Sequence, residues 1–208
     1  MRRRKDEKNE PAESVEAVDV EAVALAIGPW DASDRDTETL GDYLDLGALR
    51  VRPVEGLDVQ LPVDGDDGTI GSVVFMAPDA ALEIRAFAAR RSGGLWDDVR
   101  SEILDQVTEL SGDAEESEGP YGIELRVAVD AETADGQEGV QVSRIIGIDG
   151  PRWLLRATFL GQAALEPSND GPLMQALQDV VVVRGDGPMA PRSPLNLTLP
   201  TDAIHVEN

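Results

Sequence analysis

Few residues of this chain have the types and spacing that covalent catalysis requires. Histidine occurs once, as His205 close to the end of the sequence. A Ser-His-Asp or Cys-His arrangement needs a histidine held in a formed pocket, and chain ends are seldom ordered well enough to provide one. Cysteine is absent, which excludes disulfides, thiolate catalysis, zinc–thiolate sites and cysteine-held iron–sulfur clusters. We therefore predict no catalytic residue.

Two glycine-rich acidic stretches have the wrong spacing for a metal or a nucleotide. In "DGDDG", counted from Asp64, Gly68 falls at position five and Phe75 at position twelve of an EF-hand pattern, where oxygen ligands are needed. "GDGP", which begins at Gly185, lacks the spacing of a dinucleotide or P-loop motif. The sequence predicts no metal site and no cofactor.

Arginine and tryptophan are the residues with the greatest potential for binding, and they meet in "GIDGPRWLLRATFLG". If the residues after Asp149-Gly150-Pro151 form a strand, alternation places Trp153 on one face and both Arg152 and Arg156 on the other. On "IELRVAV" and "LEIRAF", Arg126 and Arg85 likewise oppose the more apolar face. The pattern predicts a sheet covered on one side, with arginines on its other face.

Two interpretations of these arginines remain open. They could pair across strands with Glu83 and Glu124 and keep that face soluble, each exposed pair contributing about 0–1 kcal/mol. Alternatively, they could form a small basic patch that receives an acidic peptide, either the chain's own tail or part of a partner protein.

The charge of the whole chain limits its partners. Asp and Glu number 41 against 18 Lys and Arg, a formal net charge of -23, which repels nucleic acid and anionic lipid except where a local basic patch intervenes. The basic start of the chain is followed by acidic and polar residues rather than an apolar run, and no window approaches the apolar length of a membrane helix. We expect a soluble cytoplasmic protein that binds neither membrane nor nucleic acid.

The elements that would position these residues change along the chain. Residues 1–27 have the composition of a disordered charged leader, and residues 28–47 that of an irregular arm docked through side chains such as Trp30 and Tyr43. From Leu49, short runs with a period of two alternate with turn residues, as antiparallel strands do. Residues 201–208 form a tail, so the single domain is predicted over 28–200.

Two stretches have a helical character. In "LWDDVRSEILDQVTEL" the apolar residues recur at steps of three and four, and they are Trp96, Val99, Ile103, Val107 and Leu110. A second helix is expected near Pro172, with Asn169 or Asp170 as its cap. "VVVVR", residues 180–184, fits a strand or a helix end equally well. Segregated strands and helices predict an α+β fold, with an antiparallel sheet of about six to seven strands and two main helices.

The chain also resembles a known family. The resemblance lies in "GPWD", "FAARRSGGLWDDVRSEI", "EGPYGIEL", "DGPRWLLR" and "VVVVRGDGPMAPR", which are similar to the actinobacterial family numbered 3710 among the domains of unknown function. It runs from about Gly28 to Leu199 and implies a cytoplasmic actinobacterial protein with no assigned activity. The order of strands and helices is more weakly similar to the Mog1 and PsbP proteins, which act as binding or assembly factors; that likeness is at the level of the fold.

These observations lead to two hypotheses about function. The first is a non-enzymatic interaction module that presents an arginine-dotted face or the "GPWD" arm to an unidentified partner protein, with Trp30 and Trp153 as anchors. The alternative is an enzyme or a binder of a small anionic ligand. Its pocket would lie near Trp153 and the Arg184–Arg192 loop, where Arg152 and Arg184 would clamp the anion.

Overall fold

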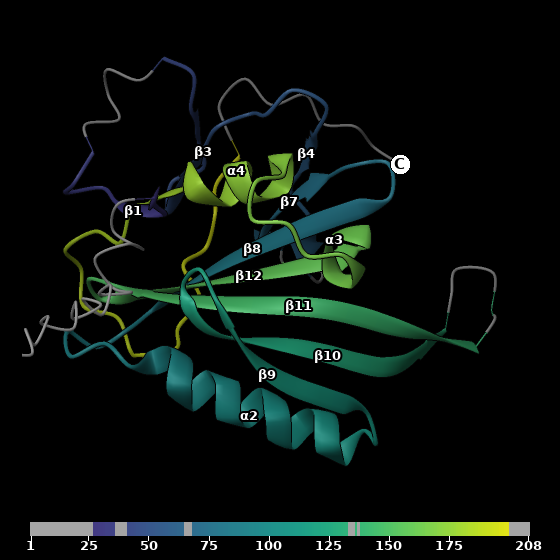
Figure 1. The fold of residues 1–208 in the computed structure, drawn as a ribbon. Helices are drawn as coiled ribbons and strands as arrows, with labels where there is room; N and C mark the ends of the chain where they lie inside the picture. Colours follow the sequence, from purple (N-terminus) through teal and green to yellow (C-terminus); the bar gives the residue numbers. More distant parts are fainter. Residues whose placement is uncertain (1–26, 36–40, 65–67, 133–135, 137, 200–208) are drawn as a thin grey trace, which may run out of the picture.

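Three layers build the protein in a computed structural model, which describes residues 27–35, 41–64, 68–132, 136 and 138–199. The middle layer is a seven-stranded sheet, a long helix lies on one of its faces, and a small sheet with shorter helices lies on the other (Figure 1). The predicted α+β class, with an antiparallel sheet of six to seven strands and two main helices, is confirmed.

The central sheet is antiparallel throughout. Its strands follow the spatial order β4 (Asp58–Gln60), β7 (Val73–Met76), β8 (Ala80–Ala88), β12 (Trp153–Gly161), β11 (Glu138–Gly150), β10 (Gly122–Glu132) and β9 (Asp113–Gly119). The acidic edge strand β9 was not predicted, because "DAEESEG" has no apolar alternation. Its charges suit an edge, since they discourage pairing with another chain.

The second sheet has four short strands: β1 (Trp30–Asp31), β13 (Val181–Val182), β3 (Leu49–Val51) and β2 (Leu44–Asp45). β1 pairs in parallel with β13, through Trp30 N–H to the Val180 carbonyl at 2.8 Å and Ala32 N–H to the Val182 carbonyl at 3.0 Å. The predicted irregular arm is therefore tied down by backbone pairing at both its ends. Val180–Arg184, undecided from the sequence, contains a strand. A separate hairpin joins β5 (Val63–Asp64) to β6 (Thr69–Ile70).

Helix α2 (Leu95–Glu109) follows the predicted pattern closely. Trp96 and Val107 are buried and Ile103 is half-buried, whereas Leu110, expected on the same face, is 69% exposed beyond the last turn. Helix α4 (Pro172–Gln178) starts at the predicted proline, but its cap is Gly171 rather than Asn169 or Asp170. Helix α3 (Gln162–Leu165) is a single turn after β12.

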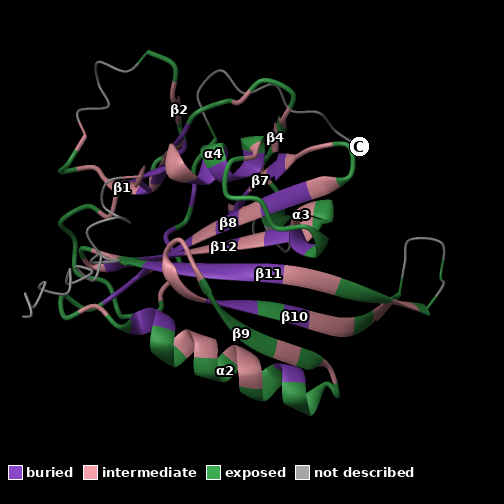
Figure 2. Ribbon diagram, in the orientation of Figure 1, coloured by how far each residue is buried: buried purple, intermediate pink, exposed green. Residues whose placement is uncertain are grey.

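Both faces of the central sheet are covered, which corrects the prediction of a one-sided layer (Figure 2). On β12, Trp153, Leu155 and Phe159 pack toward α4 and the small sheet, and Leu154 packs toward α2. The main strand contacts of helix α2 are with β9, β10 and β11, and the part of that face on β7 and β8 keeps half-buried side chains. The alternation was read correctly on each strand, but the less apolar face was mistaken for a bare one.

The last described residues join the layers. Leu195 N–H donates to the Ala86 carbonyl at 2.9 Å, and Leu197 N–H donates to the Ile70 carbonyl at 2.8 Å. The contacts are isolated bridges and do not form a strand. The pairing of β7 with β8 ends at Ile84. Beyond Ile84, the segment around Leu195 lies beside β8 in place of β7.

Candidate functional site

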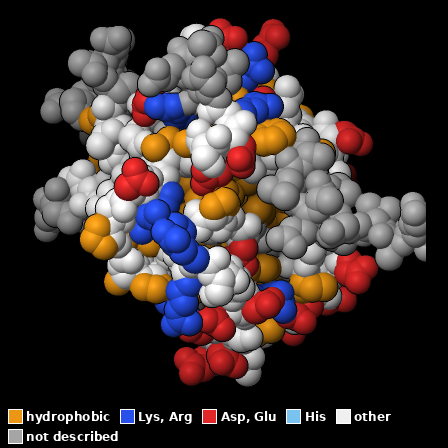
Figure 3. Space-filling view, turned by 90° about the vertical axis from the view of Figure 1, so that its left-hand side faces the viewer, with side chains coloured by type: hydrophobic (Ala, Val, Ile, Leu, Met, Phe, Trp, Pro, Cys, Tyr) orange, Lys and Arg blue, Asp and Glu red, His pale blue; other side chains and the backbone are white. Residues whose placement is uncertain are grey.

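A cavity of about 680 Å³ lies at one end of the central sheet. The arm contributes Pro29, Asp31 and Asp34, the loop between β8 and α2 contributes residues 91–94, and the turn between β11 and β12 contributes residues 147–151. Figure 3 faces this end of the molecule. Segments far apart in the sequence thus meet at one hollow, which we call the turn-end cavity.

Two tryptophans wall the cavity, and both are fixed in place. Trp96 and Trp153 are buried. The Trp96 indole N–H donates to the Ile123 carbonyl at 2.7 Å, and the Trp153 indole N–H donates to Asp31 Oδ2 at 2.7 Å. Both rings are therefore held in place as parts of the cavity wall.

Glycines in the turn allow this approach. A β-carbon on Gly147 would overlap the Trp96 ring, and one on Gly150 would overlap the Trp153 ring. Only glycine leaves room for an aromatic ring to lie directly on the strand backbone at these two positions. The "GIDGP" stretch thus shapes the cavity wall through missing side chains.

Asp149 holds the start of α2 at the cavity. Its carboxylate accepts the Leu95 and Trp96 backbone N–H groups at 3.1 and 3.2 Å, which replaces the side-chain cap that Gly94 lacks. Partial burial raises the pKa of Asp149, and these hydrogen bonds oppose the rise. The N-terminus of α2 is therefore already satisfied from within the chain.

Arg152 and Arg184, predicted as an anion clamp, do lie together beside the cavity. Arg184 Nε donates to the Arg152 carbonyl at 3.2 Å, and Arg152 Nη2 donates to the Gly185 carbonyl at 2.9 Å. Arg152 lies in the turn before β12 with a φ of 66°, not in the strand as predicted. Some of their N–H donors thus tie the Arg184 loop to the turn, and their other N–H donors have no acceptor within the described residues. The loop itself is not part of the cavity wall.

The arginines predicted on one sheet face are divided between two faces. Arg85 and Arg156 are directly paired on β8 and β12, on the side that carries α2. In the strand register, Arg126 on β10 lies directly opposite Arg144 on β11, and Arg144 lies directly opposite Phe159 on β12. Arg126 therefore lies on the other side of the sheet, with Phe159. Alternation gives the two faces of one strand, but only the register between strands tells which faces coincide. The predicted three-arginine face does not exist.

The half-buried pair on the α2 side is held by local contacts. Arg85 Nε donates to Glu83 Oε1 at 3.0 Å within the same strand, rather than across strands as expected. The Arg156 guanidinium lies 5.6 Å from the centre of the Phe87 ring, a cation–π contact. Burial lowers the pKa of Arg156, and Glu83 opposes that shift.

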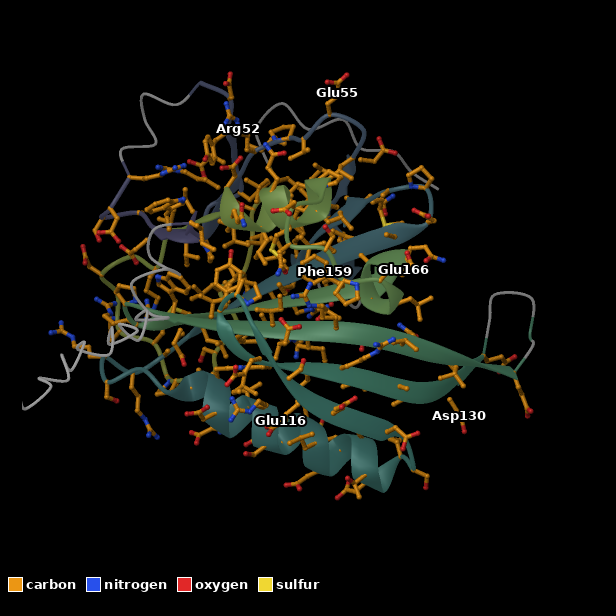
Figure 4. All side chains as sticks on the ribbon, in the orientation of Figure 1. Arg52, Glu55, Glu116, Asp130, Phe159 and Glu166 are labelled. Atoms are coloured by element: carbon orange, nitrogen blue, oxygen red, sulfur yellow. The ribbon has the colours of Figure 1, made fainter. Side chains whose placement is uncertain are left out.

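A buried ion pair on the opposite face was not predicted. Arg144 Nε and Nη2 donate to the two oxygens of Glu124 at 2.7 and 2.8 Å, and the guanidinium lies 5.5 Å from the Phe159 ring centre. Figure 4 shows Phe159 in the middle of the molecule. Alternation on β10 predicts a solvated face for Glu124. The register places Arg144 opposite Arg126, two residues along β10, and so brings Arg144 onto the same face as Glu124.

Trp30 stands apart from the turn-end cavity. It is half-buried on β1, and the Arg35 guanidinium lies 4.3 Å from its ring centre. Arg35 Nη1 also donates to the Tyr43 hydroxyl at 3.1 Å. Trp30 and Trp153, the two predicted anchors, therefore belong to different surroundings, and only Trp153 reaches the cavity.

The comparison with protein families decides what the chain is similar to. The model of the family described as "Protein of unknown function (DUF3710)" matches residues 28–205. The chain belongs to this family. No curated protein matches the DUF3710 chain, and the weaker likeness to the Mog1 and PsbP proteins stays a prediction. Within the described residues of this DUF3710 protein, no cluster of three or more acidic, histidine or cysteine side chains is arranged for a metal ion, and no helix is long and apolar enough to span a membrane. His205 lies outside the described residues.

Proposed function

We propose that the protein is a non-enzymatic binding module that captures a segment of a partner protein at the turn-end cavity. One bulky side chain of that segment would enter this hollow. The observation that carries this proposal is that two buried indole rings, each fixed by a hydrogen bond of 2.7 Å, form part of the wall of one cavity. Fixed aromatic surfaces of this kind dominate the energetics of protein interfaces.

The openness of the cavity favours a protein segment over a small molecule. Its lining includes exposed residues from the arm, the loop and the turn, among them Asp34, Ser92, Gly94 and Pro151. Sites for small ligands usually bury most of the ligand surface, whereas a hollow with an exposed rim lets an extended chain continue across it. We also propose a cytoplasmic location, which the absence of cysteine from the chain fits.

A small anionic ligand is the second candidate. Arg91 lines the cavity, and no carboxylate of the described residues pairs with it within 4 Å. A metabolite that raises the melting temperature at modest concentration would favour this function, since a ligand that binds only the folded state stabilises it.

The test blocks the cavity without disturbing its walls. Ser92 is exposed and lines the hollow, so Ser92→Trp should fill its mouth. Ser101→Trp, on the exposed side of α2, makes the same change elsewhere. Affinity purification from the native host should give a protein that wild type and Ser101→Trp retain and Ser92→Trp loses, and calorimetry with that purified protein should repeat the order. Equal capture by all three proteins would refute the proposal.

A further inference from the structure

Four arginines around the turn-end cavity form no ion pair with any carboxylate of the described residues. They are Arg90, Arg91, Arg152 and Arg184, which we call the rim arginines. Elsewhere in the described part of the chain most arginines are ion-paired, with N–O distances up to 3.9 Å. No such pair joins a rim arginine to any described residue. In a chain with 41 acidic and 18 basic residues, unpaired cations gathered at one place need an explanation.

Backbone contacts bring the rim arginines together. The Arg152 carbonyl accepts both the Ala89 N–H at 2.7 Å and Arg184 Nε at 3.2 Å. Arg90 and Arg91 follow Ala89 directly, so all four residues surround one turn. Figure 3 shows basic side chains gathered on this end of the molecule, beside hydrophobic ones.

Most N–H donors of the rim arginines have no acceptor within the described residues. Arg152 uses one nitrogen, on the Gly185 carbonyl, and Arg184 uses two, on the carbonyls of Arg152 and Gly187. Within the described residues, neither Arg90 nor Arg91 forms a side-chain hydrogen bond. A guanidinium has five N–H donors in a planar fork that matches a carboxylate, so the group retains strong capacity for anions.

The carboxylates nearby do not satisfy this capacity. Asp149 is engaged by the start of α2, and Asp31 is engaged by the Trp153 indole and by Ser33. Asp34 and Asp186 are exposed and form no ion pair with a rim arginine. The acidic groups described near the cavity therefore hold its walls or remain separate, and they leave the rim arginines able to bind an anion from outside the described residues.

Resting on the proposed function, we infer that the rim arginines bind the carboxylates of an acidic segment in the partner protein, next to the side chain that enters the cavity. The chain's net charge of -23 selects against densely charged polyanions such as nucleic acid, which it repels over its whole surface. A short segment with two or three carboxylates experiences less of this repulsion and can still form bidentate pairs with arginine.

The test uses a probe that lacks any bulky side chain, so that it reports on the arginines alone. A fluorescein-labelled peptide of alternating Glu and Gly residues is titrated with the full chain at low salt, and binding is followed by anisotropy. Arg90→Gln combined with Arg91→Gln should weaken binding about tenfold, as two exposed charge pairs of up to about 1 kcal/mol would. Both side chains are exposed, and neither forms an ion pair within the described residues, so the fold should be unchanged by circular dichroism.

Arg126→Glu is the matched control, because it makes the same change in net charge on an exposed arginine of the central sheet. It should alter binding less than twofold. Three results would overturn the inference: no saturable binding of the peptide, an equal loss in Arg126→Glu, or tighter binding of a single-stranded oligonucleotide or of inorganic phosphate than of the peptide.

The same variants separate this inference from the proposed function. Partner capture that is lost in Ser92→Trp but intact in the Arg90→Gln, Arg91→Gln protein would leave the cavity as the binding site and overturn the role of the arginines. Capture lost in both would support both. Capture intact in Ser92→Trp would refute the proposed function, and the peptide titration would then decide the anion site by itself.

Discussion

Gly147→Ala should destabilise the protein, because the new methyl group would occupy the space of the Trp96 ring. The ring cannot easily retreat, since it is 5% exposed and its N–H is bonded to the Ile123 carbonyl. Overpacking of a core costs about 1–3 kcal/mol, and loss of the indole hydrogen bond adds about 0.5–1.5 kcal/mol. We expect the free energy of unfolding to fall by about 2–4 kcal/mol.

Urea unfolding followed by tryptophan fluorescence measures this loss. Gly187→Ala is the control, because a β-carbon there meets no atom within 4 Å, and it should change stability by less than about 0.5 kcal/mol. A double-mutant cycle identifies the cause: in a Trp96→Leu background the ring is gone, so Gly147→Ala should cost at least about 1 kcal/mol less. If Gly147→Ala lowered the free energy of unfolding by the same amount in the Trp96→Leu background, or not at all in wild type, the steric argument would be refuted.

Three further predictions concern buried polar groups. Burial raises the pKa of the Tyr121 hydroxyl above its usual 10.0. The contribution of the protonated hydroxyl to stability is therefore complete below pH 10 and is lost at higher pH. The unfolding free energy of wild type should fall more steeply above pH 10 than that of Tyr121→Phe, and parallel curves would contradict this. Glu124→Leu should lower the free energy of unfolding, measured by chemical denaturation, by about 3–5 kcal/mol, because it leaves the buried charge of Arg144 without its partner. Adding Arg144→Met should recover part of this loss, and a greater loss in the double variant would exclude this cause. Asp31→Ala should lower the free energy of unfolding by about 1–3 kcal/mol, because it removes the hydrogen-bond acceptor of the Trp153 indole. Asp31→Asn keeps an oxygen and should lose less stability in the same assay. Equal losses would show that this acceptor oxygen does not stabilise the fold.

The sequence predicted the elements better than the relations between them. Trp96, Val107 and the proline of α4 carry local signals, helical spacing and a preference for the first turn, and those helices form where expected. Strand β9 carries no such signal, because an edge strand needs only backbone groups to pair with β10. Its existence depends on a neighbour that no local pattern reveals.

The candidate site shows the same limit. Trp153, Arg152 and Arg184 were expected near one another, and they are. Arg126 was placed with Arg156 because both oppose apolar residues on their own strands, yet the register puts them on opposite faces. The cavity itself depends on Gly147, whose missing side chain admits the Trp96 ring, and on Asp149, which caps a helix that starts 54 positions earlier in the chain. Neither role has a signature in the local order of residues.

The parallel pairing of β1 with β13 has a consequence for how the protein is made. Trp30 and Val181 are partners, so the first described strand leaves the ribosome long before the strand that will hold it. Contacts of such long sequence separation form late in folding. A nascent chain can complete most of its central sheet while Pro29 and Asp31 still lack their place. The turn-end cavity is then completed only after β13 has been made.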